Sequence, residues 1–188
     1  MPSSLAVPWF GALKWQKVDG SCLMEADCGA DGNCLFACMA VWMNFAEGRP
    51  RYHAGEMRCL AASALDSATA EFLCAEAQSY GEMRKTTEDL EELKQQLCHP
   101  KIWGNNTLLL LWLRAVERLH GVALEAIVLV DSESRFARVA DSSASSAASR
   151  YAICLHCIDE RHYRLLGFYC PVARRIRVIF DLDRRVFV

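Results

Sequence analysis

Apolar side chains recur every three to four positions through much of residues 34–120, which is the spacing of one helix face. The pattern predicts four helices, at residues 34–45, at about 54–78, from near 86 to 97, and a last one that is capped by Asn106 or Thr107, runs to about residue 120 and is ended by Gly121. Residues 63–69 are poor helix formers, so the second helix can break in two there. Residues 108–113 are apolar all round, which predicts that the last helix is buried.

After residue 121 the pattern changes to short runs rich in β-branched and aromatic residues, which is typical of strands. The predicted strands are residues 122–130, 151–158, 162–168, 175–180 and 184–188. Residues 1–33 contain several glycines and predict irregular structure, and the serine- and alanine-rich segment 141–150 predicts an exposed loop. Helices followed by strands indicate an α+β fold, with buried helices packed against a mainly antiparallel twisted sheet.

The composition narrows the class of protein. The 188 residues match one ordinary domain, so we expect residues 1–188 to form a single, monomeric unit. A hydrophobic share of 53% excludes a disordered chain, and a net charge of −2 lacks the basic excess of nucleic-acid binding proteins. No apolar run approaches the ~20 residues that a membrane span requires, and the N-terminus lacks the basic region of a signal peptide.

The ten cysteines do not indicate a disulfide scaffold, because several lie inside apolar helix or strand patterns. We therefore expect reduced thiols and a cytoplasmic location, in a host cytoplasm if the chain is a viral protein or a bacterial effector. Cys154 and Cys157 form one C-x-x-C, but a strand points them to opposite faces and no second pair has zinc-ligand spacing. We expect no metal and no cofactor.

Residues 28–43 carry the clearest candidate for chemistry. A turn containing Gly29, Asp31, Gly32 and Asn33 runs directly into an apolar helix that begins at Cys34. Backbone N–H groups at a helix start stabilise a thiolate, and with those of the turn they can form an oxyanion hole. Asp31 and Asn33 can cap the helix or hold the loop. Taken alone, the residues also fit a buried structural cysteine after a turn.

A nucleophilic cysteine needs a general base, and histidine is the usual one. His53, His99 and His120 are explained by helix starts, helix ends or surface loops. His156 lies in mid-strand and His162 begins a strand after a turn, and the residue pattern alone does not decide between these two.

Three segments together resemble the ovarian-tumour (OTU) family of cysteine proteases. They are DGNCLF at residues 31–36, WGNNTLLLL at 103–111 and ICLHCIDERHYRLL at 153–166. The hexapeptide at a helix start is the most specific of the three, and the local signature of papain itself is absent. The resemblance covers about residues 25–168, which leaves 169–188 as terminal strands.

The resemblance implies a papain-like OTU fold and a deubiquitinase that hydrolyses isopeptide bonds at the C-terminus of ubiquitin or a ubiquitin-like modifier. Cys34 would be the nucleophile and His162 the general base, and Asp31 would hold the loop of the oxyanion hole. That hole would be formed by Gly32, Asn33 and Cys34. Trp103 and Tyr163 are candidates for the substrate cleft, although Trp103 equally fits a core anchor and Tyr163 fits packing beside His162.

One position departs from the family pattern. Many members carry Asp or Asn two residues after the base, to orient its imidazole, and this chain has Arg164 there. A guanidinium has no acceptor for an imidazole N–H. The remaining explanations are a backbone carbonyl, a Cys–His dyad, a weak or lost activity, or another carboxylate. The candidate carboxylates are Asp27, Glu25, Asp181 and Asp183.

Two other functions fit the same residues. One is a protease that processes a viral-type polyprotein, and the other is a non-catalytic ubiquitin-binding module, which Arg164 motivates. Ubiquitin and poly-ubiquitin chains are the expected partners. The sequence does not determine linkage preference, the choice between ubiquitin and its relatives, or the source organism.

Overall fold

The computed structural model describes residues 13–19, 21–29, 32–80, 89–100, 102–130, 135–140, 149–159 and 161–188. Asp31 and most of the predicted loop at 141–150 lie outside these ranges, as does the predicted helix start near residue 86.

The helices agree closely with the apolar pattern. They are α1 (Cys34–Glu47), α2 (Ala54–Ser63), α3 (Ser67–Tyr80), α4 (Leu90–Leu97) and α5 (Asn106–His120). The expected break in the second predicted helix separates α2 from α3, and α5 is largely buried as predicted. No helix in the described ranges has both the length and the apolar character that crossing a bilayer demands.

The strands of the described residues form one sheet. They are β1 (Trp15–Lys17), β2 (Leu23–Ala26), β3 (Ala123–Val130), β4 (Arg135–Val139), β5 (Arg150–Ile158), β6 (His162–Cys170), β7 (Arg175–Arg177), β8 (Ile179–Asp181) and β9 (Val186–Phe187). The order is β1-β2-β6-β5-β3-β4, with β7 beside β6 and β8 between β5 and β9. Every pair is antiparallel except β3 with β5, so the predicted α+β fold with a mainly antiparallel sheet is confirmed.

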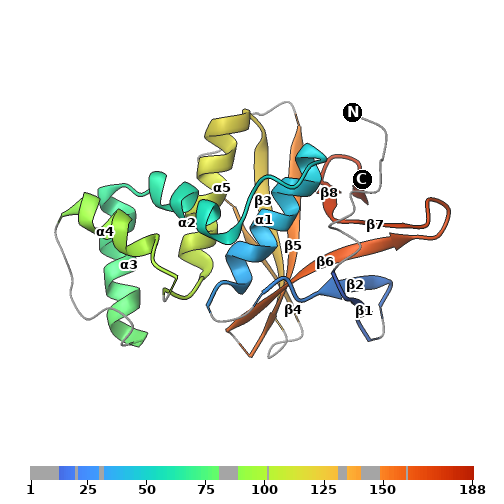
Figure 1. The fold of residues 1–188 in the computed structure, drawn as a ribbon, viewed down its shortest axis with the longest axis horizontal. Helices are drawn as coiled ribbons and strands as arrows, with labels where there is room; N and C mark the ends of the chain where they lie inside the picture. The colour runs from blue at the N-terminus through green and yellow to red at the C-terminus, as the bar shows by residue number, and fades with distance from the viewer. Residues whose placement is uncertain are drawn as a thin grey trace.

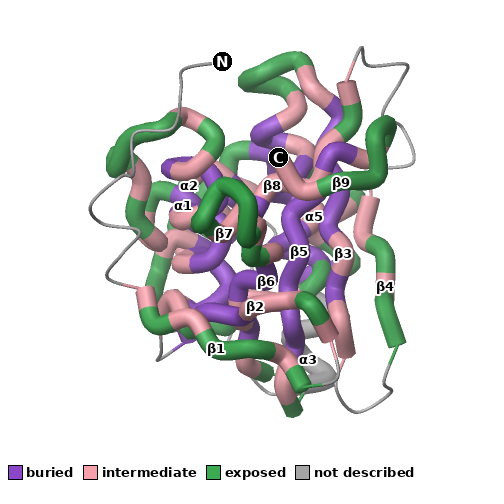
Figure 2. Tube along the Cα trace, turned by 90° about the vertical axis from the view of Figure 1, so that its right-hand side faces the viewer, coloured by how far each residue is buried: buried purple, intermediate pink, exposed green. Residues whose placement is uncertain are grey.

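Two helices, α1 and α5, pack directly against the sheet. Helix α1 packs against β5 and β6, and α5 packs against β3 and β4, while α2 contacts both helices. Figure 1 shows α2, α3 and α4 gathered at one end of the molecule, with β1, β2 and β7 at the other. Figure 2 shows that the central strand β5 is mostly buried and its neighbour β6 is partly buried, whereas the outer strands β1 and β4 are largely exposed.

Large apolar side chains from α1 and α5 fill the core between these elements. The rings of Trp42 and Trp112 meet edge to face with centroids 6.0 Å apart, and the indole N–H of Trp112 points to the sulfur of Met57 at 3.2 Å. Phe36 and Leu109 are completely buried. Each side chain of this size stabilises the fold by roughly 1.5–3 kcal/mol through burial, which fixes the start of α1 against the sheet.

Three predictions about strands were wrong. Residues 1–33 are not irregular throughout, because β1 and β2 form an antiparallel pair that extends the sheet beyond β6. Strand β4 was missed, and the predicted strand 175–180 is two short strands that pair with different partners. These strands are only three to five residues long, so their stability comes from pairing with distant segments rather than from a local pattern.

Candidate active site

Cys34 is the first residue of α1, and the turn before it sets its position. Gly32 has a φ of +79°, a left-handed conformation that a residue with a side chain rarely adopts. Asn33 follows as the N-cap, and its carbonyl accepts the first helical hydrogen bond from the Ala37 amide at 2.8 Å. The Cys34 thiol therefore lies where the backbone N–H groups of the first helical turn are free of helical partners.

The thiol of Cys34 contacts the backbone at the start of β6. Its Sγ accepts a hydrogen bond from the Tyr163 amide at 3.4 Å and lies 3.8 Å from the Arg161 carbonyl oxygen. These two residues flank His162 in the chain, so the Cys34 thiol lies against the backbone on both sides of His162. Among the described residues, the hydrogen bonds of this thiol are to backbone groups. In cysteine hydrolases the hydrogen bond between the thiol and the base often forms fully only when substrate binds.

Asp27 is the carboxylate that reaches His162. Its Oδ2 lies 3.2 Å from Nε2 of His162, and its other oxygen accepts a hydrogen bond from the Gly29 amide at 3.1 Å. Asp27 directly follows β2, which pairs with β6 through Ala26 and Leu165. The carboxylate beside His162 thus comes from the residue after the neighbouring strand, and it was one of the four candidates that the sequence left open.

Arg164 lies two residues after His162, on the same face of β6, and its contacts are to Glu25. Its guanidinium pairs with the carboxylate of Glu25, which also hydrogen-bonds to Nδ1 of His156 at 2.6 Å and to Gln16 at 2.7 Å. Burial of the Glu25 carboxylate opposes its ionisation, but the bonds from His156, Gln16 and Arg164 outweigh burial and lower its pKa. His156 is therefore engaged in a buried cluster with Glu25 and Arg164.

The other two candidate carboxylates bind the backbone elsewhere. Asp181 accepts hydrogen bonds from the Asp183 and Arg184 amides in the turn after β8. Asp183 accepts one from the Arg150 amide at the start of β5.

We expect Glu25→Gln to destabilise the fold by on the order of 3 kcal/mol, because it leaves the partly buried Arg164 without its counter-charge. The pKa of Glu25 is depressed, so its stabilisation is present above pH ~4.5 and is lost as the pH falls through the lowered value. Chemical denaturation at pH 7 and at pH 3 measures both effects. Glu91→Gln, at an exposed site on α4, should stay within ~0.5 kcal/mol of the unmodified protein. Equal losses at the two positions would contradict the expectation.

Gly32 and Asn33 face a second loop, which precedes α5. A side chain at Gly32 would meet the Pro100 carbonyl oxygen at 3.4 Å and the ring of Trp103 at 3.5 Å, so the two loops are in contact. Trp103 is 42% exposed, and Tyr163 is buried with its hydroxyl 3.4 Å from Oδ1 of Asn106. The structure thus places Trp103 at the rim beside the Cys34 turn and Tyr163 in the packing behind it.

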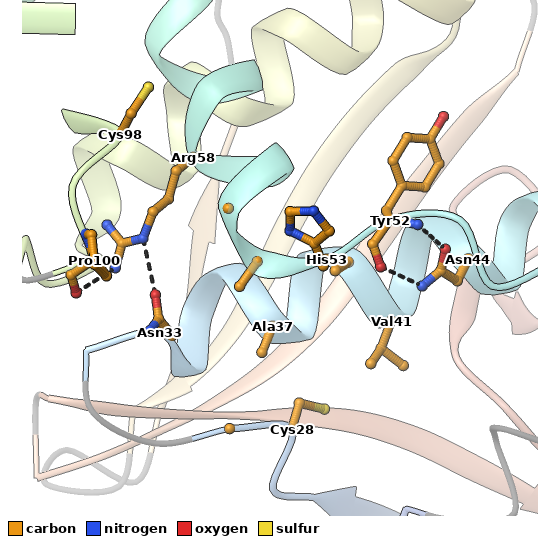
Figure 3. A pocket seen from close by; sticks show the side chains of 14 residues that line it. Cys28, Asn33, Ala37, Val41, Asn44, Tyr52, His53, Arg58, Cys98 and Pro100 are labelled. Atoms are coloured by element: carbon orange, nitrogen blue, oxygen red, sulfur yellow. Dashed lines mark hydrogen bonds between the residues drawn. The ribbon is translucent and has the colours of Figure 1, made fainter. Parts of the chain in front are cut away.

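Arg58 of α2 is the residue that sequence reasoning missed. Figure 3 shows its guanidinium between Asn33 and Pro100, at one end of a cavity of about 630 Å³ that runs along α1. The side chain is 1% exposed. A signal was present, because Arg58 has helical spacing with the buried residues Ala61 and Ala62. An arginine on the apolar face of a helix indicates a guanidinium with internal partners.

Several other thiols are held in their protonated form. Burial raises the pKa of Cys154 to about 12, and burial together with Cys59 raises that of Cys98 to about 11. Burial also raises the pKa of Cys38 well above its ordinary value, and the neighbouring Cys28 adds to this. These three thiols are weak nucleophiles at neutral pH. In the described ranges, no group of three or more His, Cys, Asp or Glu side chains is arranged to hold a metal ion.

Comparison by sequence finds no relative, because no protein-family model and no curated protein matches the chain. Comparison by structure does find similar proteins. An OTU deubiquitinase from Wolbachia pipientis superposes with a TM-score of 0.51 at 10% identity, over 78% of this chain and 88% of that chain.

Two complexes are similar over comparable lengths. An OTU domain bound to ubiquitin has a TM-score of 0.46 at 10% identity, over 85% of this chain and 76% of its own. The Hazara virus OTU bound to ubiquitin has a TM-score of 0.41 at 15% identity, over 86% of this chain and 99% of its own. The similarity to the Wolbachia structure is the basis for assigning the fold, and this fold agrees with the sequence motifs around Cys34 and His162. The chain therefore has the fold of an OTU domain, as the sequence predicted.

Proposed function

We propose that this chain is a cysteine-dependent deubiquitinase, a thiol hydrolase that cleaves isopeptide bonds at the C-terminus of ubiquitin or a ubiquitin-like modifier. The observation that carries the proposal is that Cys34, His162 and Asp27 lie next to one another. The thiol at the start of α1 contacts the backbone on both sides of His162, whose Nε2 contacts Asp27. The OTU fold supports ubiquitin as the partner, because solved OTU domains include complexes with ubiquitin.

The contacts support a definite division of roles. If Asp27 accepts a hydrogen bond from Nε2–H of His162, the lone pair of Nδ1 is left to take the proton of the Cys34 thiol. The thiolate then attacks the carbonyl carbon of the modifier's C-terminal glycine. Backbone N–H groups of Cys34 and of the Gly32–Asn33 turn stabilise the oxyanion, which is the role expected of those residues.

The second half of the cycle releases both products. The imidazolium gives its proton to the departing lysine amine, and the C–N bond breaks to leave a thioester on Cys34. Water, deprotonated by the same imidazole, hydrolyses the thioester and restores the thiol. Every step uses side chains and backbone of this chain together with the substrate and water.

Ubiquitin that carries a thiol-reactive group at its C-terminus tests the proposal directly. We expect one adduct, at Cys34, when the reduced protein is incubated with this probe and analysed by mass spectrometry. Cys22 and Cys59 are exposed and serve as internal controls for non-specific labelling. An unlabelled but folded protein, or labelling at either exposed cysteine, would contradict the proposal.

The proposal also includes the substrates of the enzyme and its location in the cell. Poly-ubiquitin chains are the proposed substrates and the cytoplasm is the proposed location. Incubation with chains of each linkage would determine which are cleaved.

Asp27→Ala should reduce turnover only about fivefold. The side chains of His162 and Asp27 are 31% and 53% exposed, and a pair this accessible to water contributes no more than about 1 kcal/mol. Initial rates on a ubiquitin substrate with a fluorescent C-terminal leaving group measure the effect. Asp27→Asn keeps an acceptor oxygen and should recover part of the loss. A reduction as large as that caused by His162→Ala would show that the pair is far stronger than its exposure implies.

A further inference from the structure

Arg58 connects the two loops that border Cys34. Its Nη2 donates to the Gly32 carbonyl oxygen at 2.8 Å and to that of Pro100 at 3.3 Å. Its Nε donates to Oδ1 of Asn33 at 3.0 Å, and its Nη1 donates to the Ile102 carbonyl oxygen at 2.7 Å. One buried guanidinium therefore binds the turn before the nucleophile and the loop before α5 (Figure 3).

The bond to Gly32 fixes the direction of a peptide group that matters for catalysis. Gly32 and Asn33 share a trans peptide bond, so the Asn33 N–H points opposite to the Gly32 carbonyl. Because Arg58 holds that carbonyl toward the interior, the Asn33 N–H is directed away from Arg58. The second bond, to the Asn33 side chain, holds the same residue by a different atom. The two bonds together restrict rotation of the peptide that leads into Cys34.

The charge of Arg58 is also unusual. Among the residues that the structure describes, no carboxylate lies within salt-bridge distance of it, and its four acceptors are uncharged oxygens. Its guanidinium stacks on the ring of Phe36 at 4.1 Å. Burial lowers the pKa of Arg58, and attraction to the Cys34 thiolate acts in the opposite direction. Because a buried cation is costly unless it is paired, the charge of Arg58 favours the negative charges that acyl transfer creates beside it.

We propose that Arg58 is a positioning residue that holds the Gly32–Asn33 turn in the geometry of an oxyanion hole. The proposal rests on the acyl-transfer chemistry proposed for Cys34, but it does not depend on ubiquitin as the substrate. Arg58 acts through the backbone of the turn and does not itself contact the reacting atoms. A point charge on a flexible stem cannot reproduce four bonds in fork geometry, so lysine is a poor replacement.

Two reactions of the same thiol separate this role from general damage. Acylation of Cys34 by p-nitrophenyl acetate passes through a tetrahedral oxyanion, whereas alkylation by iodoacetamide is a direct displacement that forms none. We expect Arg58→Lys to slow acylation by roughly 10- to 100-fold, below the 10²–10³ cost of removing a donor outright. Alkylation of Cys34, followed by mass spectrometry of its peptide, should stay within about twofold, because lysine retains the positive charge.

Two further variants keep the test decisive. Asn33→Ala removes only the side-chain tether, so it should give a smaller loss of acylation, of about two- to fivefold, even if Arg58→Lys folds poorly. Arg114→Lys changes an arginine of α5 that contacts Thr69 and Asp66 at the start of α3, and it should leave both rates unchanged.

Parallel loss of acylation and alkylation in Arg58→Lys and Asn33→Ala would overturn the proposal, and so would no loss of either. Acylation that does not depend on Cys34 in the unmodified protein would also overturn it. If the unmodified protein is acylated at Cys34 but ignores ubiquitin probes, the proposed deubiquitinase function fails while the role of Arg58 stands.

Discussion

Cys34→Ala is expected to abolish covalent capture of the ubiquitin probe and to reduce turnover by at least about 10⁴-fold. The thioester route needs a nucleophile, and when one is removed, only oxyanion stabilisation and binding remain. The variant should still fold, because alanine is apolar and only one sulfur atom smaller than cysteine, so it fits the buried site, where Cys34 is 2% exposed. Gel-shift capture and initial rates with a fluorogenic ubiquitin substrate measure the two losses.

Cys59→Ala is the matched control for this experiment, because Cys59 is an exposed thiol on α2. We expect it to leave capture and turnover unchanged. Retained turnover in Cys34→Ala would assign catalysis to another group. Activity lost equally in both variants would indicate a general effect of removing thiols.

His162→Ala is expected to lower turnover by about 10²- to 10⁴-fold, which is the range that a positioned general acid–base contributes. Binding of ubiquitin should persist, so kcat should fall far more than KM rises. The rate of the variant should increase with pH, because hydroxide and buffer bases replace the imidazole in deprotonating the thiol. A series of turnover rates between pH 6 and 9 measures this dependence.

His120→Ala serves as the control for His162→Ala. His120 lies in the last turn of α5, where a cationic side chain complements the helix dipole, and its loss should affect stability slightly and turnover not at all. A His162→Ala variant with the turnover of the unmodified protein would remove His162 from the mechanism.

The helices could be predicted because their information is local. Gly121 ends helix α5 in a left-handed conformation, as the sequence predicted, whereas the residue that caps the Leu108 amide is Asn105, one position before the earlier of the two predicted caps. Strands β1 and β2 carry no comparable local signal. Lys17 pairs with Met24 and Leu23 pairs with Phe168, and only the second of these partners belongs to a strand with a clear pattern.

The site was predictable to the extent that its residues belong to motifs. The hexapeptide identified Cys34, and the resemblance, rather than the residue pattern, separated His162 from His156. The physical reason for that choice lies in the register, because His156 faces Arg164 across the β5–β6 pair and shares Glu25 with it. Asp27 could be named only as one of four carboxylates, since the pairing of β2 with β6 decides which of them reaches the imidazole.

The distance along the chain between the partners in this site has a consequence for folding. Asp27 and His162 are 135 positions apart, and the Cys34 thiol and the Tyr163 amide are 129 apart. Contacts of such long range form late, because their loop-closure entropy is offset only when much of the sheet is assembled. A newly made chain should acquire its helices while Cys34 is still an ordinary thiol. Reactivity of Cys34 above that of an ordinary thiol therefore reports that the sheet is complete, so measuring the rate of labelling during refolding would time the last step of assembly.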